Sequence, residues 1–62
     1  MTHEQIRKTI QWALTEMDLA DKMLEQSKAE SIPSAAKLLK EDSSVRYRTA
    51  VLVLKAAVIY LN

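Results

Sequence analysis

Apolar residues recur at alternating spacings of four and three along the first part of the chain. The positions that keep this rhythm are Ile6, Ile10, Ala13, Met17, Ala20 and Leu24. Such spacing is typical of an amphipathic helix with a coiled-coil-like seam. Thr2 and Gln5 fit the capping box that opens a helix, in which each side chain bonds to the other residue's backbone N–H. The pattern therefore predicts a first helix over residues 3–29.

The strongest break signal in the chain is Pro33. Proline is tolerated in the first turn of a helix but not inside one, and it biases the preceding Ile32 away from helical angles. We predict a second helix over residues 33–61, capped by Ser31 or Ile32. Residues 42–44 favour helix caps over helix interiors. A kink there, or a split into helices 33–41 and 44–61, is therefore the alternative.

Two helices of similar length joined by a short turn pack antiparallel. The predicted fold class is therefore all-α, an antiparallel helical hairpin that forms a single domain over residues 1–62.

The C-terminal half of the second helix is apolar on nearly every side. One apolar line holds Val45, Leu52, Ala56 and Ile59, with Leu38 earlier at the same seven-residue spacing. A second line, roughly opposite, holds Tyr47, Val51, Leu54, Val58 and Leu61, and a strip of smaller residues (Ala50, Val53 and Ala57) separates the two. A helix that is hydrophobic all round is buried, and one partner helix cannot cover it. We therefore expect Leu52 to be buried and the hairpin to self-associate into a helical bundle.

Composition narrows the class of protein further. The 62 residues are 48% hydrophobic and 27% charged, which is an ordinary globular balance. The absence of Gly excludes a Gly-rich phosphate loop and disfavours an all-β fold, and the absence of Cys excludes disulfides and thiolate metal sites. A domain of about 60 residues buries only about 60% of the surface of its unfolded chain. Without disulfides, oligomerisation is the remaining way for so small a domain to bury more of its surface.

Charge is nearly balanced overall but differs between the halves. The net charge is +1; residues 1–31 hold six acidic and four basic residues, net −2, and residues 32–62 hold two acidic and five basic, net +3. In a hairpin that turns near residue 32, the numbers of facing residues add to about 64. The predicted neighbours are Arg46 with Asp18, Arg48 with Glu16, and Lys37 and Lys40 with Glu25. The alternative is that these four basic residues, with Tyr47 between the arginines, bind the phosphates and bases of RNA or DNA.

Few residues offer catalytic or metal chemistry. His3 is the sole histidine, and nothing in the sequence positions a partner for it. Asp18, Asp21 and Glu25 share one helix face, as carboxylates that bind a hard cation would. Lys22 lies among them and favours a solvated face instead. We predict that the protein is not an enzyme and has no catalytic residues, no metal site and no cofactor.

The residues predicted to form a self-association or partner interface flank the main seams. They are Trp12, Leu19 and Met23 on the first helix, and Tyr47, Val51, Leu54, Val58 and Leu61 on the second. Tryptophan anchors interface hot spots, and methionine adapts to irregular partners. We therefore predict a small interaction module, an adaptor, co-chaperone or regulator, that acts as a homo-oligomer and binds a partner protein.

An all-helical hairpin of about 60 residues is similar in architecture to plasmid RNA-regulating hairpins and to small co-chaperones of type III secretion, and architecture alone does not fix function. The apolar stretch from Ala50 to Leu61 is shorter than the roughly 20 residues of a membrane-spanning helix. The start of the chain also lacks the features of a secretory signal. We expect a cytoplasmic protein; nucleic-acid binding is the alternative function, and peripheral membrane attachment through the second helix is a weaker one.

Overall fold

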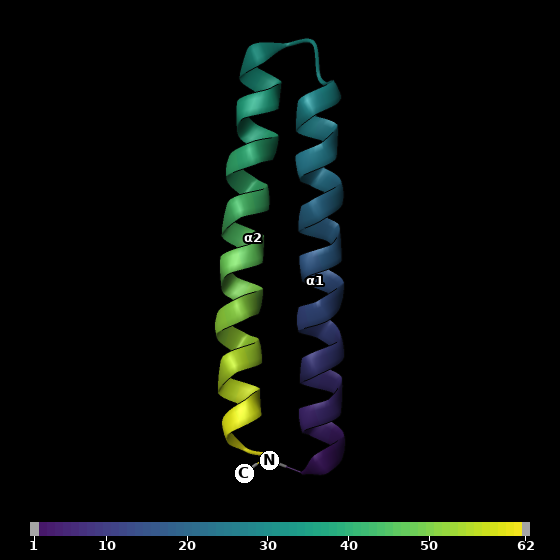
Figure 1. The fold of residues 1–62 in the computed structure, drawn as a ribbon, viewed down its shortest axis with the longest axis vertical. Coiled ribbons are helices and arrows are strands. Elements are labelled where there is room, and N and C mark those ends of the chain that lie inside the picture. Colours follow the sequence, from purple (N-terminus) through teal and green to yellow (C-terminus); the bar gives the residue numbers. More distant parts are fainter. Residues whose placement is uncertain (1, 62) are drawn as a thin grey trace.

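The computed structural model describes residues 2–61, which form two long helices joined by a short turn. Helix α1 spans His3–Ala29, and helix α2 spans Pro33–Ile59. The helices lie side by side and antiparallel, with the turn at one end and the start of α1 and the end of α2 at the other (Figure 1). The molecule measures 45 × 14 × 11 Å. The structure confirms the predicted antiparallel helical hairpin.

Local signals set the beginning of α1 as predicted. The Gln5 N–H donates to Thr2 Oγ1 at 3.1 Å, and the Thr2 N–H donates to Gln5 Oε1 at 2.9 Å. This reciprocal capping box satisfies two backbone donors that the first helical turn would otherwise leave unpaired.

The second helix also begins where the sequence predicts but ends earlier. Ile32 is its N-cap in an extended conformation, and Pro33 occupies the first turn. The predicted end at residue 61 is wrong by two residues. The Tyr60 N–H bonds to the Ala57 carbonyl at 3.1 Å and the Leu61 N–H to the Val58 carbonyl at 3.0 Å, a tighter turn that closes the helix after residue 59.

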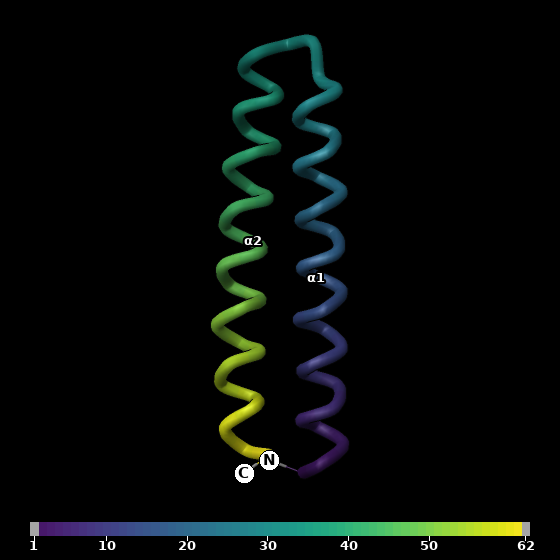
Figure 2. Tube along the Cα trace, viewed as in Figure 1, coloured from purple at the N-terminus to yellow at the C-terminus, as the bar shows by residue number. Residues whose placement is uncertain are grey.

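Helix α2 is continuous through residues 42–44, so the alternative split is wrong (Figure 2). Ser43 explains how a weak helix former is accommodated at this point. Its side chain is buried against α1, and its hydroxyl donates to the Ala20 carbonyl at 2.6 Å. The hydroxyl is therefore satisfied across the interface, as buried polar groups generally are.

The two helices meet along a line of mostly small side chains that repeats every seven residues. This contact line consists of Ile6, Ala13, Ala20 and Ser27 on α1 and Ser43, Ala50 and Ala57 on α2, and these are the buried residues of the two helices. The hydrogen bond from Ser43 to Ala20 fixes the register. Steps of seven residues in opposite directions then place Ala13 opposite Ala50 and Ile6 opposite Ala57. Small side chains at these positions allow the helix axes to approach closely.

The contact line shows which side of α2 packs on α1. Leu52, which we expect to be buried in a bundle, is not buried by α1: in the single chain it is 62% exposed, and Leu38, Val45 and Ile59 on the same line are 60–71% exposed. The strip between the two apolar lines of α2, with Ala50 and Ala57, packs against α1 instead. The large side chains on either side of that strip are left at the surface of the hairpin.

Candidate interaction surfaces

The predicted interface residues lie on two opposite sides of the hairpin rather than on one. Tyr47 and Val51 line a groove together with Leu24 of α1. Met23 lies on the other side, because it is seven residues, or two turns, from Glu16, whose carboxylate bonds to Arg46 across the interface. We call these two sides the groove face and the Arg46 face. By the same helical spacing, Leu54 and Val58 belong to the groove face, and Trp12 and Leu19 to the Arg46 face. Leu61 follows the end of α2 and lines a smaller groove with Ile6 and Ile10.

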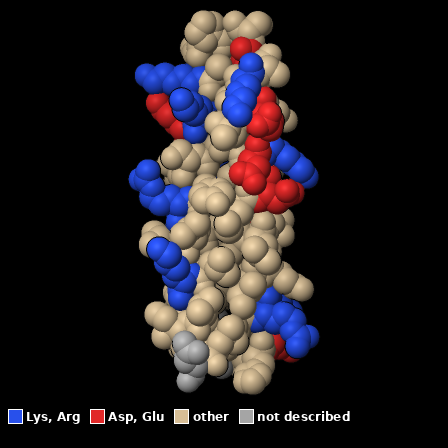
Figure 3. Space-filling model, in the orientation of Figure 1, with Lys and Arg blue, Asp and Glu red and all other residues tan. Residues whose placement is uncertain are grey.

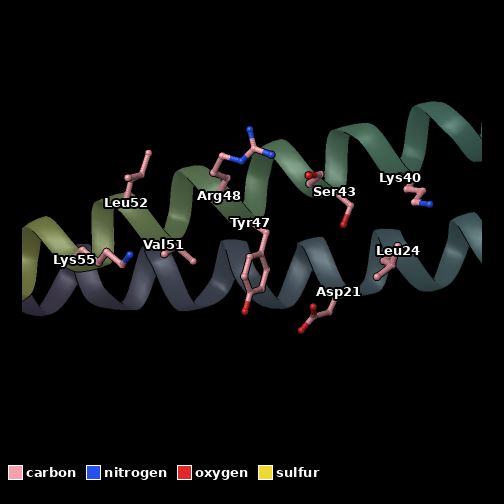
Figure 4. A pocket seen from close by; sticks show the side chains of 10 residues that line it. Asp21, Leu24, Lys40, Ser43, Tyr47, Arg48, Val51, Leu52 and Lys55 are labelled. Atoms are coloured by element: carbon pink, nitrogen blue, oxygen red, sulfur yellow. The ribbon is translucent and has the colours of Figure 1, made fainter.

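The groove on the groove face has a volume of about 680 Å³ and is lined mostly by α2, with Asp21 and Leu24 contributed by α1. Its walls combine apolar side chains with three basic residues and one acid; besides the residues already named they include Asp21, Lys40, Arg48 and Lys55. Tyr47 and Val51 point from α2 toward α1, whereas Arg48 and Leu52 point away from α1 (Figure 4). Apolar side chains therefore form the floor of the groove, and charged side chains form its rims.

The Arg46 face is held by an ion pair between the helices. One Arg46 guanidinium nitrogen lies 3.2 Å from Glu16 Oε2, and another lies 3.4 Å from Asp42 Oδ2. The hydrogen bond to Glu16 and the charge of Asp42 raise the pKa of Arg46 above its ordinary value. The predicted pairing of Arg46 with Asp18 is wrong, because Asp18 lies on the outer side of α1 and pairs with Lys22 at 3.1 Å.

The remaining basic residues do not follow the predicted pairing either. Glu25 pairs with Lys28, one turn along its own helix, and Lys37 lies 4.0 Å from Glu41. Lys40 and Arg48 take part in none of the ion pairs found among residues 2–61. Of the four basic residues considered for nucleic-acid binding, the hairpin therefore engages two with acids and leaves two at the groove.

A third surface follows the side of α2 that faces away from α1. Four large side chains at seven-residue spacing are 60–71% exposed; they are Leu38, Val45, Leu52 and Ile59. We call them the outer line. Side chains seven residues apart stay nearly in a row along a helix, so this line is a continuous apolar stripe about 30 Å long.

Charge is distributed unevenly over the side of the hairpin that carries the groove (Figure 3). Basic side chains run along α2, acidic ones gather on α1 in the half nearer the turn, and the strip between the helices toward the opposite end is almost free of charge. Toward the chain ends the apolar strip is therefore flanked by basic side chains on both helices, and Lys55 and Arg7 line the two grooves there.

Among the titratable residues, His3 lies at the edge of the contact between the helices. His3 is exposed in the first turn of α1 and lines a second, smaller groove of about 300 Å³ with Ile6, Arg7, Ile10, Gln11 and Leu61. Within residues 2–61 no group of three His, Asp or Glu side chains is arranged to hold a metal ion. Neither of the two described helices has a stretch long and apolar enough to cross a membrane.

Sequence reasoning missed Asp21 as a groove residue and the outer line as an exposed surface. The signal that could have located both is the seven-residue repeat of Ala and Ser in each helix, because it marks the contact line and thereby the sides that remain free. In comparisons with known proteins, no family model, no curated protein and no solved structure matches the chain significantly.

Proposed function

We propose that the hairpin is a non-enzymatic protein-interaction module that works as a helical-bundle oligomer and binds a partner protein. The observation that carries this proposal is the amount of large apolar surface that the hairpin leaves exposed on separate sides. Tyr47 and Val58 on the groove face, Trp12 on the Arg46 face and the whole outer line are each more than 40% exposed. Contiguous apolar surface on a small protein marks an interaction site.

The outer line supports an amphipathic helix as the partner's binding element. Its four side chains lie in one row at seven-residue spacing, and Asp42 and Lys55 are polar residues on its two flanks. A helix with an apolar seam of period 3.5 places its own side chains in the same rhythm, so knobs of one helix fit holes of the other. An adaptor, co-chaperone or regulator would recognise its partner in this way.

Affinity capture with matched variants tests the proposal. Val45→Asp puts a charge into the outer line at a residue that lines neither groove, whereas Thr15→Asp places the same charge on the exposed side of α1 that carries no apolar row. We expect the wild type and Thr15→Asp to retain one protein at high salt and Val45→Asp to lose it, with the helix content of all three unchanged by circular dichroism. Equal retention by Val45→Asp and Thr15→Asp would contradict a role for the outer line.

One observation favours nucleic-acid binding as the second candidate. Lys40, Arg48 and Lys55 line the groove beside the aromatic ring of Tyr47. Phosphate contacts make affinity fall with salt, with a slope of about −0.9 per phosphate on duplex DNA, so three contacts per hairpin give about −3. A captured nucleic acid that elutes with this salt dependence, and is lost on Arg48→Glu, would replace the first proposal.

A further inference from the structure

An apolar strip follows the groove face along most of the hairpin. The larger groove contains Leu24 of α1, and the smaller groove near the chain ends contains Ile10. These two residues are 14 positions apart, or about four helical turns, so their side chains project to the same side of α1. Apolar residues at helical spacing connect the two grooves; they are Leu14 and Met17 on α1 and Val51, Leu54 and Val58 on α2.

Basic side chains flank this apolar strip on both helices (Figure 3). Lys40, Arg48 and Lys55 line the larger groove from α2, and Arg7 lines the smaller one from α1. None of these four takes part in an ion pair among residues 2–61. Of the described residues that line the two grooves, Asp21 alone is acidic. Four bases against one acid leave the edges of the strip with a surplus of three positive charges.

The bases on α2 recur at a nearly regular interval. Lys40, Arg48 and Lys55 follow one another after eight and seven residues, or about 12 Å and about 10.5 Å along the axis. Arg7 stands across the strip from Lys55, because the Ser43–Ala20 hydrogen bond shows that residue numbers at one level of the two helices add to 63. Positive charge therefore lies on both edges of the strip near the chain ends and continues along the α2 edge toward the turn.

We infer that the groove face binds an acidic amphipathic helix of a partner protein, which lies against α1 and α2 as the third helix of a bundle. The apolar seam of such a helix would cover the apolar strip, and carboxylates on its flanks would meet the bases at the edges. A heptad repeat returns a flanking position every seven residues, so one row of Asp or Glu would face Arg48 and Lys55 in turn. This inference rests on the proposed role as an interaction module and adds the chemistry of a partner.

Other occupants of the groove face are disfavoured by its charge. A second copy would bring the same surplus of positive charge, and with the two turns side by side its Lys55 would lie next to Arg7. Nucleic acid and anionic lipid would both pair with the bases, but each would set phosphates near Asp21. A nucleic acid would also leave the apolar strip uncovered, so the bases alone would bind it.

A synthetic peptide tests this inference with a defined probe. It has about 28 residues, which at about 1.5 Å per residue matches the 45 Å length of the hairpin. Each heptad has leucine at the two seam positions and glutamate at the two flanking positions, and the control peptide has lysine in place of every glutamate. By fluorescence anisotropy of labelled peptides, we expect the wild type to bind the glutamate peptide about tenfold more tightly than the lysine peptide. The difference should shrink as salt is added.

Charge reversal shows whether the groove bases cause this preference. Lys55→Glu and Lys22→Glu change the net charge equally, but Lys55 lines the groove, whereas Lys22 is exposed beside Asp18 on the outer side of α1. We expect Lys55→Glu to bind the glutamate peptide about tenfold more weakly and the lysine peptide more tightly. Lys22→Glu should bind both peptides as the wild type does. Equal effects of the two reversals would overturn the inference.

A neutral substitution tests the apolar strip separately. Leu14 is 53% exposed on the groove face, so Leu14→Gln removes apolar surface and is expected to keep its helix content by circular dichroism. It should bind the glutamate peptide at least about fivefold more weakly. The matched control Thr15→Gln, one residue further and on the outer side of α1, should bind it as the wild type does.

The remaining outcomes distinguish the groove face from the proposed function. Equal binding of the two peptides, or binding of neither while Val45→Asp still loses its captured protein, would overturn the acidic helix and leave the proposed function in place. Tighter binding of duplex DNA or of phosphatidylserine vesicles than of the glutamate peptide, lost in Lys55→Glu, would assign the groove face to that anion instead. A dimer that Leu14→Gln converts to monomers, with no peptide bound, would assign it to a second copy. If neither peptide binds and Val45→Asp captures the same protein as Thr15→Asp, the proposed function fails as well.

Discussion

Replacing Ala50 by leucine tests the contact line directly. Ala50 and the facing Ala13 are both 0% exposed, so the space between the helices at this level is already filled. A leucine has three more carbon atoms than alanine and reaches further from the backbone. To place it there, the helices must separate locally or the side chain must adopt a strained rotamer.

The expected cost follows from this overpacking. Inserting extra methylene groups into a close-packed core costs about 1–3 kcal/mol. A 62-residue domain has a free energy of unfolding of about 3–9 kcal/mol at about 0.05–0.15 kcal/mol per residue. Each lost kcal/mol lowers the melting temperature by about 4–8 °C in a domain of this size. We therefore expect Ala50→Leu to melt at least about 4 °C below the wild type.

Thermal melts followed by circular dichroism measure this difference, with all proteins at one concentration because association shifts the apparent stability. The matched control is Ala56→Leu, which makes the same substitution on the same helix at an exposed position. If Ala50→Leu melts at or above the temperature of Ala56→Leu, α2 does not pack on α1 through the line of small residues. The register fixed by Ser43 would then be wrong as well.

Three further substitutions test individual contacts by the same melts. Ser43→Ala removes a hydrogen bond worth about 0.5–1.5 kcal/mol and should melt below Ser44→Ala, which makes the same change at an exposed position; equal melting temperatures would contradict the bond. Thr2→Ala removes the capping box and should cost about 0.5–2 kcal/mol, and an unchanged melt would mean that the helix end contributes nothing. Arg46→Glu places a negative charge beside two carboxylates and should lower the melting temperature more than Arg48→Glu, with the difference shrinking as salt is added; the reverse order would contradict the observed pairing.

The helices themselves could be predicted because their signals are local. The capping box of Thr2 and Gln5 marks the start of α1, and Pro33 marks the start of α2, each through a few neighbouring atoms. The antiparallel arrangement follows from the short turn, since two helices separated by three residues have no room for another path. The end of α2 was placed two residues too late because no helix-stopping residue stands near Ile59.

The face of α2 that packs on α1 could not be predicted from hydrophobicity, which ranks Leu52 above Ala50. A hydrophobic ranking counts the area of one side chain, whereas a helix pair gains from contacts along its whole length when the axes approach closely. Ala13 and Ala50 permit that approach, and a pair of leucines at the same level would hold the axes apart. The predicted partner of Arg46 was incorrect for a related reason. Successive residues are about 100° apart around a helix, so an error of two residues in register exchanges Glu16, beside the interface, for Asp18, on the outer side.

The choice of small residues for the contact line also explains why association is expected at all. Burying a leucine or valine side chain stabilises a fold by about 1.5–3 kcal/mol, and burying a single methylene by about 0.8 kcal/mol. Among residues 2–61 the fully buried apolar positions are four alanines and one isoleucine. Because the alanines occupy the inside, leucine, valine, tyrosine and tryptophan side chains occupy the outside, where the hairpin alone gains little from them. Only a surface beyond the hairpin can bury these larger side chains, so the close approach of α1 and α2 and the expected binding of a further copy or partner have the same cause.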